Sequence, residues 1–141
     1  MDATFDLDRF IRAQEKQYPE ALNEISNGRK ETHWMWFVFP QLEGLGFSPL
    51  SKKYGIKNRD EALAYLHHIV LGPRLVAITQ ALLEVKGKSA YEIMGSPDDL
   101  KLKSCMTLFA LVSKEGNAFQ RVLDKYFEGE HDEKTIVLLN K

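Results

Sequence analysis

The residues best suited to chemistry lie together in one segment, 28–41, which holds both tryptophans of the chain. Two cations, Arg29 and Lys30, and an imidazole, His33, precede a run of aromatic and aliphatic side chains that ends at Gln41. Lysine and arginine bind anions, histidine exchanges a proton near neutral pH, and indole rings attract cations and planar groups. The segment therefore suits a small anionic ligand with an aromatic part, such as a nucleotide.

From this pattern we expect a small-molecule site that binds or transforms an anionic ligand. The candidate catalytic residue is His33, which would exchange a proton with the ligand. Arg74 joins the anion-binding set because it falls in the first turn of a predicted helix, where free amides and the helix dipole favour negative charge. Gln41 or Tyr54 would orient the ligand. The full set of candidate ligand-binding residues is Arg29, Lys30, Gln41, Tyr54 and Arg74.

The same segment also has a purely structural interpretation. A short stretch that is apolar on all sides is typical of a buried central helix, which here would be capped by Thr32 and would end at Pro40. The two cations before it would then simply be solvated. Under both interpretations the aromatic core residues are Trp34, Trp36 and Phe37.

A different class of function, a non-enzymatic module that binds a partner protein, stays open because no familiar catalytic signature occurs. The chain has no Gly-x-Ser-x-Gly, His-Glu-x-x-His or Cys-x-x-Cys motif. Gly87-Lys88-Ser89 looks like the end of a phosphate-binding loop, but Leu82 stands where that loop needs glycine. His67 and His68 are adjacent on a predicted helix and splay apart by about 100°, so they cannot share a metal. We predict neither a metal nor an organic cofactor, and the sequence leaves open whether the protein is an enzyme.

Charge and cysteine usage narrow the partners and the compartment. Nineteen basic and twenty acidic residues give a formal net charge of -1, so no overall positive field attracts nucleic acid or anionic lipid. Cys105 is the only cysteine, which favours a core role and a reducing compartment. The first residues are acidic, and no apolar run approaches the ~18 residues of a membrane span. We therefore expect a cytoplasmic protein that binds neither nucleic acid nor membranes. The sequence does not indicate its oligomeric state.

The elements that must position these residues are helices. At 141 residues and 44% hydrophobic content, the chain suits one domain, residues 1–141, with a single core. Amphipathic stretches with helical spacing follow one another with short turns between them. The expected fold is all-α, a single compact irregular array of about seven to eight helices.

Turn and cap residues divide this array. Pro49, Pro73 and Pro97 each predict the first turn of a helix, and Ser89-Ala-Tyr-Glu92 has the form of a capping box. Pro19 divides the first helical pattern into a broken helix or a helix pair. Two short apolar stretches, 34–39 and 135–139, leave a small two-stranded element as the alternative.

The chain also resembles a known family through motifs spread over nearly its whole length. Gly28-Arg-Lys30 and His33-Trp-Met-Trp-Phe-Val-Phe-Pro-Gln41 resemble the domain-of-unknown-function 1810 family, and the likeness continues from Gly44-Leu-Gly46 to Thr107-Leu-Phe109. The resemblance implies the all-helical fold of small bacterial proteins, and the function of the family is unassigned. Some members carry the label calpastatin, which we set aside because that inhibitor is an unstructured repeat protein.

Overall fold

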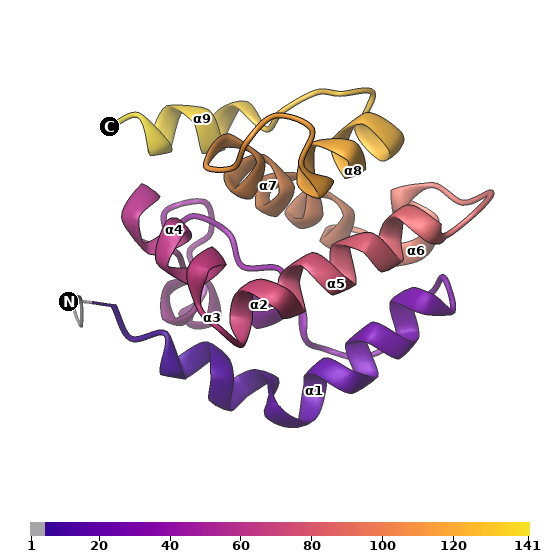
Figure 1. Cartoon of the computed structure of the whole chain (residues 1–141), viewed down its shortest axis with the longest axis horizontal. Helices are drawn as coiled ribbons and strands as arrows, with labels where there is room; N and C mark the ends of the chain where they lie inside the picture. Colours follow the sequence, from indigo (N-terminus) through magenta and orange to yellow (C-terminus); the bar gives the residue numbers. More distant parts are fainter. Residues whose placement is uncertain (1–4) are drawn as a thin grey trace.

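Helices make up the regular structure of the computed structural model, which describes residues 5–141 (Figure 1). Within those residues there is no strand, only an isolated bridge between Leu42 and Ile56. The predicted all-α fold is confirmed, with nine helices in the described part of the chain rather than seven or eight. They are α1 (Asp8–Ser26), α2 (Met35–Val38), α3 (Pro49–Lys53), α4 (Arg59–His67), α5 (Leu71–Glu84), α6 (Ala90–Met94), α7 (Asp98–Leu111), α8 (Ala118–Phe127) and α9 (Glu133–Leu139).

The first helix continues through its proline. We expected Pro19 to break α1 or to divide it into a pair, but α1 is one helix of 19 residues with Pro19 inside it. Proline lacks the N–H that would bond to the preceding turn, so it bends a helix that neighbouring contacts hold together. Figure 1 shows this bend near the middle of α1.

Local capping chemistry defines several of the other helix starts as predicted. Pro49 is the first residue of α3, and the side chain of Ser48 accepts a hydrogen bond from the backbone N–H of Ser51 at 3.1 Å. The capping box of Ser89 and Glu92 is present at the start of α6. Pro97 was expected within the first turn of α7, but it lies at the N-cap, one residue before the helix begins at Asp98. These helix starts could be predicted from the sequence because each depends on neighbouring residues alone.

The elbow between α4 and α5 differs from the prediction. The helix begins at Leu71 rather than at Pro73, because Nδ1 of His68 accepts the backbone N–H of Leu71 at 3.3 Å and of Val70 at 3.0 Å. Gly72 makes the elbow possible, since a Cβ there would lie only 2.0 Å from the carbonyl oxygen of Leu66. His68 is half-buried and its neighbour His67 is exposed.

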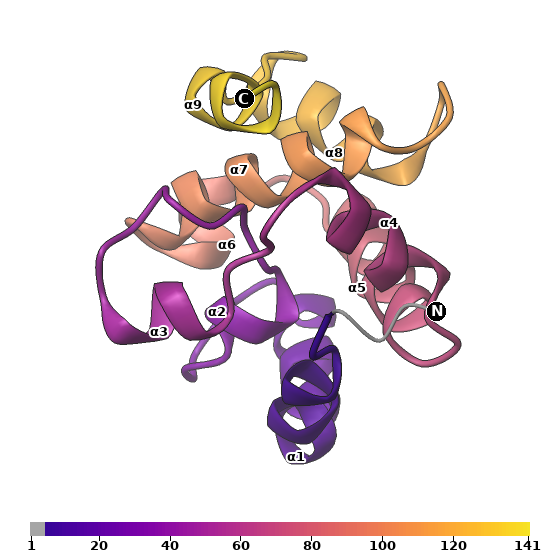
Figure 2. The ribbon, with the colours of Figure 1, turned by 90° about the vertical axis from the view of Figure 1, so that its left-hand side faces the viewer.

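The core gathers around α7, which lies between α4 and α6 on one side and α8 and α9 on the other (Figure 2). Phe109 of α7 packs against Tyr65 of α4 and Phe119 of α8, with ring centroids 5.5 and 5.7 Å apart. Cys105 is fully buried in the same helix, and burial raises the pKa of its thiol well above the usual value. Its predicted role as a small apolar core residue is confirmed.

A buried ion pair joins α1 to α4. The guanidinium of Arg9 lies 2.9 Å from a carboxylate oxygen of Glu61, and both side chains are buried. Arg9 also donates to the backbone oxygens of Lys53 at 2.7 Å and Gly55 at 2.9 Å. The other oxygen of Glu61 accepts the backbone N–H of Lys57 at 2.7 Å. We call this cluster the Arg9 joint, and its charges are matched one to one.

Neither ambiguous stretch forms a strand. Residues 35–38 form the single turn of α2, and residues 133–139 form α9, so the alternative of a two-stranded element is wrong. Among residues 5–141, no single helix has the length and hydropathy to cross a bilayer. Only α4 and α5 taken together pass that test, and they are bent by 87° relative to each other.

Candidate functional site

A buried carboxylate holds the start of the segment 28–41 in place, and we call this stretch the tryptophan segment. Glu24, in the last turns of α1, accepts the backbone N–H groups of Glu31 at 2.7 Å and Thr32 at 3.1 Å. Its oxygens also accept the hydroxyl of Thr32 at 2.6 Å and the indole N–H of Trp34 at 2.9 Å. Burial alone raises the pKa of Glu24, but these hydrogen bonds to its ionised form outweigh that effect and lower the pKa to about 2. Glu24 therefore stays charged and fixes the loop that follows.

The turn after α1 explains how the chain reaches Glu24 again. Gly28 ends the helix with φ +77, a conformation that favours glycine, and its amide bonds to the carbonyl of Ile25 at 2.8 Å. Lys88, from the loop before α6, donates to the carbonyl of Gly28 at 2.9 Å. The amide of Lys30 then donates to the carbonyl of Ile93 in α6 at 2.7 Å. Residues 28–30 are thus fixed between α1 and α6.

The tryptophan segment is only partly core. Trp34 is completely buried, whereas Trp36 and Phe37 are half-buried and pack at the edge of the core. The prediction that all three are core side chains is therefore wrong for Trp36 and Phe37, since a single turn as short as α2 cannot point every side chain inward. Thr32 does not cap α2, because its hydroxyl and amide are both bound to Glu24.

Two lysines and one carboxylate meet beside the tryptophans. Nζ of Lys30 lies 2.9 Å from Asp98, and Nζ of Lys101 lies 3.4 Å from the other oxygen of the same carboxylate. The exposed fractions of the three side chains are 7% for Lys30, 19% for Asp98 and 23% for Lys101. Lys30 stands 4.8 Å from the ring centroid of Trp34, and Lys101 stands 4.0 Å from that of Trp36. We call Lys30 and Lys101, together with Asp98, the lysine pair. Its two ammonium groups share one carboxylate, so the cluster has a net charge of one positive unit.

A hollow of about 260 Å³ opens onto the lysine pair, and we call it the His33 pocket. Trp36 forms part of its wall, and the exposed side chain of His33 stands at its edge. Within residues 5–141, the imidazole of His33 hydrogen bonds to no other group. The pocket thus offers a titratable imidazole, two ammonium groups and an indole ring. The lining residues are Lys30, His33, Trp34, Met35, Trp36, Phe37, Leu50, Asp98 and Lys101.

Gln41 and Tyr54 lie in a second place. Both line a narrow cleft with space of only about 10 Å³, room for about one water, and Trp36 forms the wall between this cleft and the His33 pocket. Tyr54 is buried, and its ring packs 5.3 Å from that of Phe37. Gln41 also lines a larger hollow beneath α9. Tyr54 is thus chiefly a core side chain, while Gln41 stays accessible.

The two predicted arginines lie outside these hollows. Arg74 donates to the side-chain oxygen of Gln14 at 3.3 Å and stands over the ring of Tyr18 at 5.3 Å. The hydroxyl of Tyr18 donates in turn to the carbonyl of Arg74 at 2.7 Å. These contacts join α5 to α1 and give Arg74 a structural position. Arg29 is exposed, and its backbone amide continues the turn that ends α1.

The structure therefore brings Lys30 and His33 together, keeps Gln41 close by across Trp36, and places Arg74 elsewhere. Sequence reasoning missed Asp98 and Lys101, which complete the pocket from the first turn of α7. Their spacing of three residues marks one helix face. Nothing local in the sequence signals that this face meets the segment 28–41.

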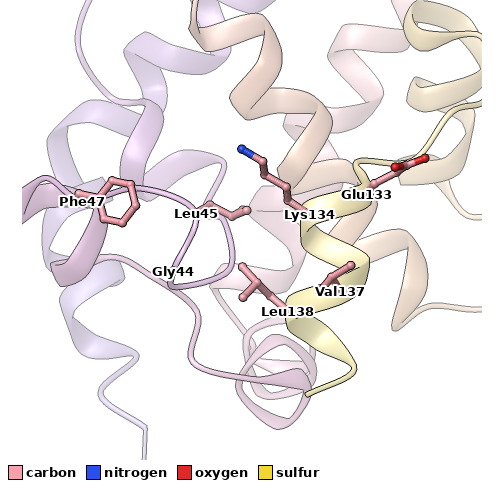
Figure 3. Close-up of a pocket in the computed structure, with 7 residues that line it drawn as sticks. All are labelled: Gly44, Leu45, Phe47, Glu133, Lys134, Val137 and Leu138. Carbon is pink, nitrogen blue, oxygen red and sulfur yellow. The ribbon is translucent and has the colours of Figure 1, made fainter.

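An apolar groove lies between the loop 44–47 and α9 (Figure 3). It has a volume of about 420 Å³, and Phe47 at its edge is 88% exposed. Figure 3 shows Leu45 facing Lys134 and Leu138 across the groove. We call it the Phe47 groove.

Comparison with known proteins places the chain. Residues 4–139 match the family described as a protein of unknown function (DUF1810). The chain belongs to the DUF1810 family. It is also similar to a crystal structure of the conserved hypothetical protein Rv1873 from Mycobacterium tuberculosis, with 51% identity over 97% of this chain and 98% of that chain, and a TM-score of 0.95. No curated protein matches this DUF1810 chain. The comparisons confirm the resemblance and carry no activity with them.

Proposed function

We propose that the His33 pocket binds a small anionic ligand that has a planar part, in the manner of a nucleotide. The observation that carries the proposal is the charge excess of the lysine pair. Two ammonium groups share the one carboxylate of Asp98 in a hollow where all three side chains are at least three-quarters buried. Holding an uncompensated charge away from water costs free energy, and an anionic ligand removes that cost.

The side chains around the lysines suit the remaining part of such a ligand. Trp36 is half-buried and presents indole surface to the hollow beside Lys101. Nζ of Lys101 lies over this ring at 4.0 Å from its centroid, so a planar group that packs beside the indole also meets the ammonium group. His33 stands at the edge with no partner among the described residues, so it can donate to the anion or exchange a proton with it. If the bound ligand reacts in this pocket, His33 is the residue that would transfer the proton.

The direct test is a thermal-shift screen of nucleotides, sugar phosphates and inorganic phosphate. A ligand at one hundred times its dissociation constant stabilises the protein by about 2.7 kcal/mol. We expect at least one nucleotide to raise the melting temperature of the wild type, and to do so far less for His33→Ala and Lys101→Met. Lys114→Ala is the matched control, because exposed Lys114 lies beyond the opposite end of α7.

The proposal fails if no anionic compound stabilises the wild type, or if both pocket variants respond as the control does. That outcome would favour the other function expected from the sequence, a module that binds a protein partner. The Phe47 groove is where such a module would be examined first, because Phe47 is the most exposed large hydrophobic side chain among the described residues.

A further inference from the structure

A second, larger hollow adjoins the His33 pocket. It has a volume of about 540 Å³ and lies between the start of α7, the start of α9 and the loop around Gln41. Lys101 lines both hollows. One ammonium group therefore stands where the two spaces meet, and we call the larger space the α9 hollow.

Size is the first argument that the two hollows act together. Sites for small molecules and cofactors have volumes of about 300 to 1,000 Å³. The His33 pocket, at about 260 Å³, is just below that range, while the two hollows together lie well inside it. A ligand of nucleotide size that enters the His33 pocket must extend beyond it, and the way past Lys101 leads into the α9 hollow.

The chemistry of the α9 hollow differs from that of the His33 pocket. Among the described residues, the amide of Gln41 and the ammonium of Lys134 make no hydrogen bond or ion pair. One oxygen of Asp132 binds the N–H and hydroxyl of Thr135 at 3.1 and 2.5 Å, which leaves its other oxygen available. Donors and acceptors are thus mixed, as hydroxyl groups require because each both donates and accepts.

Charge decides which part of a ligand goes where. Apart from the shared Lys101, two acids (Asp132 and Glu133) and two bases (Lys103 and Lys134) line the α9 hollow, so its charges are balanced and it carries no excess that favours a second anionic group. Lys101, which lines both hollows, and Lys30, which lines the His33 pocket and shares Asp98 with it, favour the anionic group on the His33 side of the junction. An uncharged hydroxylated group fits beyond it, and a planar ring fits beside Trp36.

We propose that the ligand is a nucleoside diphosphate that carries a further hydroxylated group, such as a sugar. Its ring lies in the His33 pocket, its diphosphate crosses Lys101, and its hydroxylated end contacts Gln41 and Lys134 in the α9 hollow. This inference rests on the proposed function, because it takes the His33 pocket as the site of the ring and the anion. It adds the class of the ligand and the residues that distinguish it.

The test is a ladder of probes measured by isothermal titration calorimetry: AMP, ADP and ADP-glucose, and in parallel UMP, UDP and UDP-glucose. We expect affinity to rise at each step in at least one of the two series. His33→Ala and Lys101→Met weaken every probe of that series. Gln41→Ala and Lys134→Ala weaken only the sugar-bearing probe, by about tenfold for each lost hydrogen bond, and Lys114→Ala changes none.

The outcomes separate this inference from the proposed function. If the monophosphate binds and depends on His33, but the sugar adds no affinity and the Gln41 and Lys134 variants bind all probes like wild type, the ligand is confined to the His33 pocket. The further inference is then overturned and the proposed function survives. If no probe binds, or binding is indifferent to His33 and Lys101, both are overturned.

Discussion

The Arg9 joint and the lysine pair are both clusters of partly or fully buried charge, yet they are built differently. In the joint, Arg9 faces Glu61, and backbone groups of Lys53, Gly55 and Lys57 bind their other donors and acceptors. In the pair, Lys30 and Lys101 share Asp98, and one positive charge is left over. A cluster whose charges are balanced serves the fold. A cluster with a net positive charge is suited to bind an anionic ligand.

The largest effect should come from breaking the Arg9 joint. Arg9→Ala leaves the completely buried carboxylate of Glu61 without its cation, and loss of one partner of a buried pair costs about 3–5 kcal/mol. Urea unfolding followed by circular dichroism measures this change in the free energy of unfolding. Arg12→Ala, which removes an exposed ion pair with Asp8 on the same helix, is the control and should cost less than about 0.5 kcal/mol. Equal costs for the two variants would contradict our account of the joint.

Glu24 should give the next largest effect and a distinctive pH dependence. Glu24→Gln replaces the charged acceptor of four hydrogen bonds, and we expect a cost of about 2 kcal/mol at neutral pH. The folded pKa of about 2 is below the unfolded value of ~4.3, so the contribution is complete above pH ~4.3 and is lost as the pH falls toward 2.

Urea midpoints for wild type and Glu24→Gln, measured from about pH 7 down to about pH 3, test this sign. The difference between the two proteins should shrink on acidification. A difference that stays constant or grows would show that the carboxylate charge does not hold the loop.

The sequence predicted the features that depend on residues close together in the chain. It did not predict those that depend on contacts between distant segments. The capping box at Ser89 was readable because it lies within four residues. The candidates Lys30 and His33 were found from residue types alone, and the structure places them on one pocket. Asp98 and Lys101 were missed because a meeting between the start of α7 and the loop after α1 depends on how the helices pack. For the same reason, the sequence could not show that Arg74 faces Tyr18 and Gln14 instead.

Within the lysine pair, substitution of the acid should lower the free energy of unfolding more than substitution of a lysine. Asp98→Asn removes the carboxylate that both lysines share and should cost about 1–2 kcal/mol of unfolding free energy. Lys101→Met retains the apolar stem over Trp36 and removes the excess charge, so its cost should be less than about 0.5 kcal/mol. Chemical denaturation of the two variants side by side measures the asymmetry. If Lys101→Met cost as much as Asp98→Asn, the pair would be balanced internally.

The smallest effect on binding is expected at Arg74. Arg74→Met loses the contacts to Gln14 and Tyr18 and should destabilise the fold by about 1 kcal/mol, because both contacts are partly exposed. Its affinity for nucleotides, measured by calorimetry, should equal that of wild type. A loss of affinity as large as that of His33→Ala would place Arg74 in the site after all.

The central claim is that the extra positive charge of the lysine pair serves binding and not stability. The most direct measurement is one set of urea unfolding curves for wild type and Lys101→Met, each with and without the best-bound nucleotide of the screen. We predict that the free Lys101→Met variant is as stable as wild type, and that the nucleotide stabilises the wild type far more than it stabilises the variant. A variant that is markedly less stable when free, yet gains as much from the nucleotide as wild type does, would contradict the claim.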